Sequence, residues 1–374
     1  MISKNEKIDV KTLIRKYSLP LVGIGPMSKD CVDIIFKYSQ ERNRPMFLIA
    51  TRRQIEASII GEGYVNNWST EEFSTYISAL KKKYPKSAVY LCRDHGGPWQ
   101  GINENNLNYK EALRRALLSF ETDIISNFDI LHIDPSIHPK KKLPYRLIIS
   151  RMKRIMFHCH EFAKKLHKKI EFEIGTEETN GSITEMMGFK NFIKDINLFC
   201  EKNNIAKPLF VVGQTGSLVK EMRQVGDFDT SNTKKLISIC NHNGVLFKEH
   251  NVDYLSEYQL SLRREVGVHA INVAPEFGVI ETKCFIKQCY EENKLVLVKR
   301  FLSLSLSSRK WEKWIINEKY INSFDRSIIA GHYVFSNEKF IKLRDKLDRS
   351  KLREKIEREI YKKLNFYQNK PLFG

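Results

Sequence analysis

Residues 89–98, VYLCRDHGGP, join a run of apolar residues to a group of polar residues that can do chemistry. A short and nearly continuous apolar run is typical of a β-strand that is buried on both faces of a sheet. Asp94 and His95 stand where this strand is expected to end, and two glycines follow them. An adjacent carboxylate and imidazole at a strand end can act as an acid/base pair or help to bind a metal ion, although many such histidines are only buried and hydrogen-bonded.

Seven other segments repeat this pattern along the chain. They span residues 21–26, 46–51, 130–136, 170–177, 209–216, 244–251 and 268–276. The sequence between the strands suits helices, at residues 30–41, 70–83, 110–127, 144–169, 183–203, 232–243 and 255–266. Eight such β/α units predict an α/β fold, a closed (β/α)8 or TIM barrel, in which functional residues gather at the C-terminal ends of the strands. The alternative, an open doubly wound sheet, usually has a G-x-G-x-x-G turn after its first strand, and this sequence has none.

The pattern becomes helical beyond about residue 280. We therefore expect a barrel over residues 1–285 and a helical extension over residues 286–374. Apolar residues recur at helical spacing within residues 336–364, which predicts one charged helix with a single apolar stripe. Residues 338–370 contain 12 Lys or Arg and 6 Asp or Glu, so this extension is basic and is expected to pack on the barrel or on a partner.

Composition excludes several classes of protein. The 374 residues carry a formal net charge of +19, but the basic runs are short and dispersed and lack a nucleic-acid-binding motif, so a solvated basic surface is the simpler interpretation. No run of 18 apolar residues occurs, and the first residues, MISKNEKIDVK, lack the apolar core of a signal peptide. The seven cysteines are odd in number and form no C-x-x-C pair, which suits a reducing compartment. These features predict a cytoplasmic protein that binds neither nucleic acid nor a membrane.

Two further strand ends carry residues that bind metals or move protons. Glu177 follows Glu173 at the end of the fifth strand, and His250 ends the seventh. In a barrel these positions fall at the same mouth as Asp94 and His95. Two imidazoles and a carboxylate would form a site for a divalent metal, with zinc as the expected ion, although acidic residues in the first turn of a helix are also common without a ligand.

Two late loops are candidates for binding a phosphate group. Gly213, Gln214, Gly216 and Ser217 follow the sixth strand, and Asn272 lies at the end of the eighth. Backbone N–H groups in such loops bind anions, and phosphate sites of barrels often follow the late strands, although turns that contain glycine are also common without this role. The sequence has no G-x-x-x-x-G-K-[ST] motif, which argues against a P-loop kinase.

Other polar residues fall near the expected mouth or inside the strands. Arg52 and Arg93 add positive charge near the ends of the second and third strands, which suits an anionic substrate. His132 lies inside the fourth strand. We expect it and the seven remaining histidines to be core or surface residues rather than ligands.

Several of these segments, in order over residues 10–290, resemble a known family: the accessory (non-catalytic) subunit of bacterial class II D-tagatose-1,6-bisphosphate aldolase. The matching pieces are Ala50-Thr51 with Gln54, Gly63-Tyr64, Asp94-His95-x-Gly97-Pro98, His132-Ile133-Asp134-x-Ser136, Ile174-Gly175-Thr176-Glu177 and His250-x-x-Asp253-Tyr254. That family is related to the catalytic class II aldolases. The resemblance therefore implies the same barrel and, in it, aldol chemistry.

The resemblance also implies roles for individual residues. Asp94 would exchange a proton with the aldehyde or alkoxide oxygen, and His95 and His250 would bind the metal. Glu177 or Glu178 stands near the position of a ligand histidine in the catalytic subunits, and Glu177 would be a further ligand. Apart from the resemblance, we expect a carboxylate, Glu173 or Glu177, to move the carbon-bound proton.

We therefore expect metal-dependent aldol or retro-aldol chemistry on a phosphorylated ketose. The sequence departs from the family at Ile49 and Cys92, near the expected mouth, so the sugar need not be tagatose bisphosphate. One alternative is a carbon-4 epimerase of a ketose phosphate, which would cleave and re-form the bond without releasing the fragments. The other is a non-catalytic subunit that stabilises a separate class II aldolase. The expected partners are a phosphorylated sugar and either a catalytic aldolase subunit or a second copy of the chain.

Overall fold

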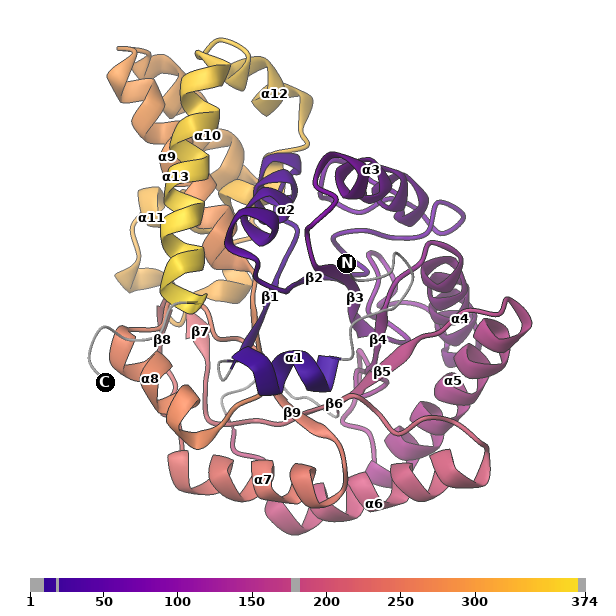
Figure 1. The fold of residues 1–374 in the computed structure, drawn as a ribbon. Coiled ribbons are helices and arrows are strands. Elements are labelled where there is room, and N and C mark those ends of the chain that lie inside the picture. The colour runs from indigo at the N-terminus through magenta and orange to yellow at the C-terminus, as the bar shows by residue number, and fades with distance from the viewer. Residues whose placement is uncertain (1–9, 18–19, 176–181, 369–374) are drawn as a thin grey trace.

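Eight parallel strands close into a barrel, as the sequence predicts (Figure 1). The computed structural model describes residues 10–17, 20–175 and 182–368. The barrel strands are β1 (Leu21–Ile24), β2 (Met46–Thr51), β3 (Val89–Gly96), β4 (Ile130–Ile133), β5 (Glu171–Ile174), β6 (Phe210–Val212), β9 (Leu246–Glu249) and β10 (Ala270–Val273). Each predicted apolar run contains one of them. A short antiparallel hairpin, β7 (Val219–Lys220) and β8 (Arg223–Gln224), follows β6.

The helices between the strands surround the barrel (Figure 1). They are α2 (Lys29–Arg42), α3 (Thr70–Lys83), α4 (Tyr109–Ile125), α5 (Tyr145–Lys165), α6 (Met186–Lys202), α7 (Thr230–His242) and α8 (Glu257–Val266). Local sequence signals start several of them. For example, the side chain of Ser69 accepts a hydrogen bond from the N–H of Glu72, and the Glu72 carboxylate accepts one from the N–H of Ser69, which together form a capping box at the start of α3.

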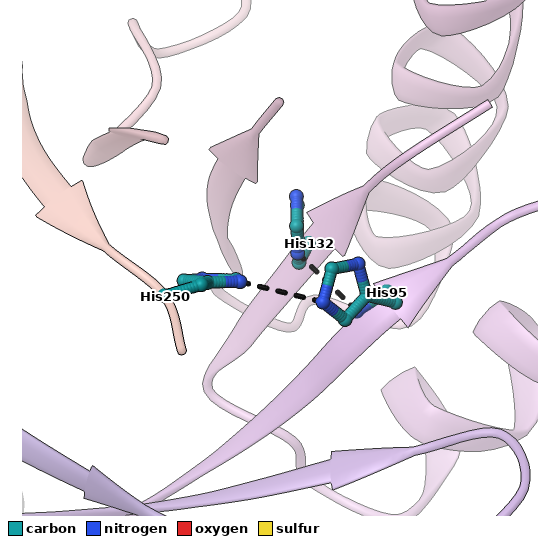
Figure 2. Close-up of side chains that lie close together, drawn as sticks. All are labelled: His95, His132 and His250. Atoms are coloured by element: carbon teal, nitrogen blue, oxygen red, sulfur yellow. Dashed lines mark hydrogen bonds between the residues drawn. The ribbon is translucent and has the colours of Figure 1, made fainter. Parts of the chain in front are cut away.

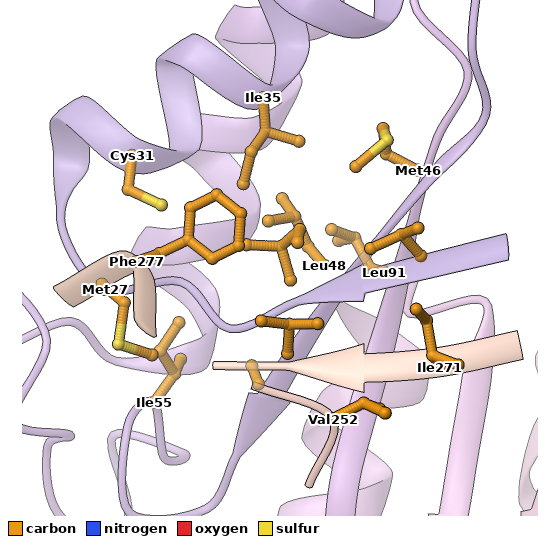
Figure 3. Packing of buried hydrophobic residues seen from close by; sticks show 14 of the residues in the cluster. Met27, Cys31, Ile35, Met46, Leu48, Ile55, Leu91, Val252, Ile271 and Phe277 are labelled. Atoms are coloured by element: carbon orange, nitrogen blue, oxygen red, sulfur yellow. The ribbon is translucent and has the colours of Figure 1, made fainter. Parts of the chain in front are cut away.

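Successive strand residues point alternately to the helices and to the barrel interior. Leu48 and Leu91 face outward and pack against Ile35 of α2 and Phe277, as Figure 3 shows. Phe47 faces inward and packs with apolar residues from other strands at the N-terminal end of the barrel. Helix α1 (Val10–Tyr17) packs on this second cluster and covers that end of the barrel (Figure 1). The candidate residues Asp94, His95 and His250 lie at the opposite, C-terminal ends of the strands.

The helical extension continues directly from the barrel. Helix α9 (Pro275–Glu291) runs through the expected boundary at residues 285 and 286, and α10 (Leu295–Ser307), α11 (Ser323–Ala330), α12 (Glu338–Arg344) and α13 (Arg349–Gln368) follow it. Phe285 of α9, Phe301 of α10 and Phe340 of α12 form a cluster with ring centroids 5.0–5.4 Å apart. None of the described helices is long and apolar enough to cross a membrane.

The apolar stripe over residues 336–364 does not lie on one helix, contrary to the prediction. The helical conformation is interrupted between α12 and α13. The physical reason is a local cap, because the side chain of Asp348 accepts hydrogen bonds from the N–H groups of Ser350 and Lys351 at the start of α13. Leu343 and Leu347 before α13, and Leu352 and Ile356 within it, are buried.

Candidate active site

A break in the regularity of β3 brings two consecutive residues to the barrel interior. Asp94 points inward and Arg93 outward, as alternation requires. The pairing of β3 with β4 shifts register between Arg93 and Gly96, and His95 has a left-handed backbone with φ of 45°. Such a bulge re-aims a side chain. His95 Nε2 consequently lies 4.0 Å from Asp94 Oδ1, on the same side of the strand.

Three histidines meet at this mouth, as Figure 2 shows. His95 comes from β3, His132 from β4 and His250 from the end of β9, and their ring centroids lie 5.1–5.2 Å apart. The sequence led us to expect His132 to be an ordinary core or surface residue. Alternation along β4 was the available signal, because His132 lies between Leu131 and Ile133, which face the helices, and so points to the barrel interior, where it pairs with Glu173.

A carboxylate orients His95. The ring Nδ1 of His95 lies 3.0 Å from Asp134 Oδ2, which also accepts a hydrogen bond from the side chain of Gln100. This contact directs His95 Nε2 towards the other two imidazoles. Close packing at Gly97 helps to fix the position of Asp134, because a Cβ atom on Gly97 would lie only 2.2 Å from the carbonyl oxygen of Asp134.

A second carboxylate orients His250. Glu173 Oε1 lies 2.8 Å from His250 Nε2, and Glu173 Oε2 lies 2.6 Å from Lys248 Nζ. The ammonium group of Lys248 lies above the rings of Phe47 and Phe210, deeper in the barrel. Burial disfavours the ionised form of Glu173, but Lys248 and the neighbouring histidines outweigh it and lower its pKa to about 2. Glu173 is therefore ionised and accepts a hydrogen bond from His250 Nε2. The other ring nitrogen of His250, Nδ1, then faces His95 at the centre of the site.

The donor atoms fit a divalent metal ion. His250 Nδ1 lies 3.4 Å from His95 Nε2, and Asp94 Oδ1 lies 3.6–4.0 Å from the nearest ring nitrogens of the three histidines. Two ligands of a tetrahedral zinc ion, each about 2.0–2.1 Å from it, lie about 3.3 Å apart. Two overlapping donor sets have possible ligand atoms that all lie within 4.8 Å of one another: the three histidines, and His132 and His250 with Asp94 and Glu173. Glu173 is paired with the charged group of Lys248, whereas His132 Nδ1 accepts only a backbone N–H, that of His95, so the three histidines are the set that we favour.

Asp94 is buried and lies among the imidazoles of the three histidines. Burial raises the free energy of its ionised form, but the imidazoles of His95 and His250 outweigh this effect and hold the pKa of Asp94 well below its usual range. The side-chain amide of Asn272, on β10, donates to Asp94 Oδ1 at 3.4 Å. Asn272 thus lies in the site next to the proposed acid/base group.

The two arginines expected at the mouth are instead buried within the protein framework. Arg52 donates to Glu56, to Glu104 and to a backbone carbonyl, and its guanidinium group is fully buried. Arg93 directs its five N–H donors to Asp123, Thr70 and two backbone carbonyls. Both guanidinium groups are engaged by these partners rather than by the three histidines, and Arg93 points outward from β3 to Asp123 of α4.

The remaining predicted residues are less directly placed. Glu177 lies outside the described residues, so its role as ligand or base stays a prediction. In the loop after β6, the N–H groups of Gly213, Gln214 and Gly216 donate to protein acceptors, and Ser217 Oγ donates to the Glu249 carboxylate. Their phosphate-binding role also stays a prediction.

The start of α9, after β10, already carries an anion-binding arrangement. Asp253 Oδ1 accepts hydrogen bonds from the N–H groups of Ala274 and Glu276, both 2.9 Å long. These are the groups that would bind a phosphate at a helix N-terminus. An internal carboxyl group, whose pKa is raised to about 8 by burial and by Glu276, therefore occupies the position that the sequence suggested for an anionic ligand.

The fold resembles several solved structures. A probable tagatose 6 phosphate kinase from Sinorhizobium meliloti 1021 superposes with a TM-score of 0.70 at 16% identity, covering 93% of this chain and 99% of the other. The YdjI aldolase from Escherichia coli K12 gives 0.54 at 11% identity, over 96% and 94% of the two chains. Fructose-bisphosphate aldolase (Fba) from Campylobacter jejuni gives 0.57 at 10% identity, over 96% and 94%. No protein-family model and no curated protein matches the sequence. The similarity establishes the barrel fold.

Proposed function

We propose that this protein catalyses metal-dependent aldol or retro-aldol chemistry on a phosphorylated ketose. The observation that carries the proposal is the convergence of Asp94 with three histidines at the C-terminal mouth of the barrel. Two of the structural neighbours are named as aldolases, and a third name refers to tagatose 6 phosphate, which supports this class of substrate. The absence of a P-loop motif from the sequence argues against transfer of phosphate from a nucleotide.

In this proposal His95, His132 and His250 would hold the ion. A divalent metal at that position polarises a carbonyl oxygen and stabilises negative charge that develops on it. Asp94 accepts the proton of the carbon-4 hydroxyl as the bond between carbons 3 and 4 breaks, and it returns the proton when the bond forms. Its ionised resting state is the one that cleavage requires.

Glu173 takes a different role from the one suggested by the sequence. Both of its oxygens are engaged, and its pKa of about 2 makes it a weak base. We therefore assign Glu173 to orienting His250. The group that moves the carbon-bound proton is then better sought in Glu177.

The experiment that tests the proposal uses purified protein loaded with Zn²⁺ and a panel of ketose phosphates and bisphosphates. Products are followed by NMR spectroscopy. Appearance of an aldehyde and a smaller ketose phosphate identifies an aldolase, whereas conversion into the carbon-4 epimer without free fragments identifies the epimerase. A metal-loaded protein that leaves every ketose phosphate unchanged would contradict the proposal and favour the accessory-subunit alternative.

A further inference from the structure

The loop that follows His250 has an unusual backbone. Asn251 and Tyr254, only three residues apart, both adopt left-handed conformations, with φ of 58° and 60°. Residues other than glycine seldom adopt this conformation, and it costs free energy that the surrounding structure must supply. The position of His250 therefore depends on whatever holds this loop, residues 251–254.

Contacts from the barrel hold one side of the loop. The N–H of Val252 donates to the backbone carbonyl of Asn272, and the Asp253 carboxylate accepts the two N–H groups at the start of α9. The N–H of Tyr254 donates to Glu276 Oε2 at 2.9 Å. These contacts tie the loop to β10 and α9.

The end of the C-terminal helix holds the other side. The hydroxyl of Tyr367, in the last turn of α13, lies 2.6 Å from Glu276 Oε2 and 3.1 Å from the carbonyl oxygen of Val252. Lys363, one turn earlier, forms an ion pair of 2.7 Å with Glu276 Oε1. Tyr367 is fully buried. Glu276 thus links α13 to the loop through the same carboxylate oxygen that receives the N–H of Tyr254.

We propose that Tyr367 is a positioning residue for His250, so that the end of the C-terminal extension sets the geometry of the metal site. The inference rests on the proposed metal-dependent function. Its basis is that one hydroxyl contacts both the loop itself and the carboxylate that anchors the loop. The extension then has a role at the mouth in addition to covering one side of the barrel.

The substitution Tyr367→Phe tests this role, and Tyr361→Phe is a matched control. Tyr361 lies on the same helix, but its hydroxyl contacts Glu41 on α2, away from the loop. Binding of Co²⁺ is measured by titration and by its visible absorption spectrum. We expect Tyr367→Phe to weaken Co²⁺ binding about tenfold, at the low end of the effect of removing an outer-shell contact, and to alter the spectrum, while Tyr361→Phe leaves both unchanged.

A second measurement does not depend on metal. The metal-free proteins are labelled with ¹⁵N-histidine, and the His250 signals are assigned with His250→Gln. We expect Tyr367→Phe to shift the His250 signals and Tyr361→Phe to leave them in place. If Tyr367→Phe lowers the melting temperature but alters neither Co²⁺ binding nor the His250 signals, Tyr367 is only structural and the inference is wrong. If wild-type protein binds no metal yet the NMR shift occurs, the metal proposal fails while the positioning role stands.

Discussion

At the scale of single residues, the centre of the barrel depends on a buried ion pair. Glu173 and Lys248 are each only 1% exposed, and each satisfies the charge of the other. Removing one partner of such a pair leaves an uncompensated buried charge, which typically costs about 3–5 kcal/mol. Lys248 is also too firmly paired to act as a nucleophile, since Glu173 outweighs the effect of burial and raises the pKa of Lys248.

We therefore predict strong coupling between these two residues. Glu173→Gln and Lys248→Met should each lower the free energy of unfolding by about 3–5 kcal/mol, and the double substitution should cost clearly less than their sum. Urea denaturation of the four proteins measures the coupling. Additive effects would show that the two charges do not compensate each other.

The proposed acid/base residue gives a prediction about rate. Asp94→Asn should reduce turnover by about 10²–10⁴-fold, because the amide cannot exchange a proton at neutral pH. The variant keeps an acceptor for the side chain of Asn272, so its melting temperature and metal content should stay close to those of the wild type. Turnover by Asp94→Asn at the wild-type rate would exclude Asp94 as the acid/base group.

The histidines give a prediction about metal content. Wild-type protein, purified without chelators, should contain about one divalent ion per chain by elemental analysis, and His95→Ala should lose it because few ligands are present. His242→Ala serves as the control, since this exposed histidine ends α7 and its ring contacts the backbone carbonyl of Ser238 in the same helix rather than the site. Full metal occupancy in His95→Ala would remove His95 from the set of ligands.

At the scale of secondary-structure elements, one contact between α9 and α2 should respond to pH. Glu281 of α9 is buried and accepts a hydrogen bond of 2.6 Å from Ser28 Oγ at the start of α2. Burial, followed by repulsion from Asp30, raises its pKa from 4.5 to about 8. Below pH 4.5 the Glu281 carboxyl group is protonated in both the folded and the unfolded protein. Between pH 4.5 and 8 the unfolded chain releases a proton that the folded chain retains, so stability falls as pH rises, by at most about 1.4 kcal/mol per unit.

The substitution Glu281→Gln should remove this loss of stability at high pH. We expect the variant to melt at the wild-type temperature near pH 4.5 and at a higher temperature at pH 8. Glu354→Gln, at an exposed position on α13, should show no difference that grows with pH. Equal melting temperatures of Glu281→Gln and wild type at pH 8 would mean that Glu281 is already ionised in the folded protein.

The elements were largely predictable because each barrel strand is a short apolar run between polar segments. All eight strands and the seven surrounding helices lie where this pattern places them. The break between α12 and α13 was missed because apolar spacing continues across it, although Asp348 is a recognisable cap residue. The boundary between barrel and extension was placed at residue 285 because the pattern of apolar residues becomes helical there. Helix α9 continues through this boundary without interruption.

The site was only partly predictable from strand ends. That reasoning placed Asp94, His95 and His250 together, since parallel strands end at one mouth. It could not foresee the bulge that turns His95 inward, because nothing in the residue types requires it. Side chains alternate along β3, so Arg93 points outward if Asp94 points inward. The burial of Arg93 against α4 could therefore have been predicted from the sequence.

At the scale of the whole molecule, the barrel and the extension share one hydrophobic core. A single cluster of buried residues runs from the strands through α9 to apolar residues of α10, α12 and α13, including Phe301, Phe340 and Ile360. Charges join the same parts, since Arg353 of α13 pairs with Asp30 of α2 at 2.7 Å. Removing either part would expose a large apolar surface on the other.

We therefore predict that the two parts unfold together. Two variants test this, one that keeps only Trp99 of the barrel and one that keeps only Trp311 of the extension, with the other tryptophans replaced by phenylalanine. Both tryptophans are buried, so each fluorescence signal reports the unfolding of its own part. The urea midpoints of the two variants should coincide with their midpoints by circular dichroism. If Trp311 became exposed at a clearly lower urea concentration than the circular dichroism change in its own variant, while Trp99 did not, the extension would be an independent unit. Its proposed control of His250 would then need a different physical basis.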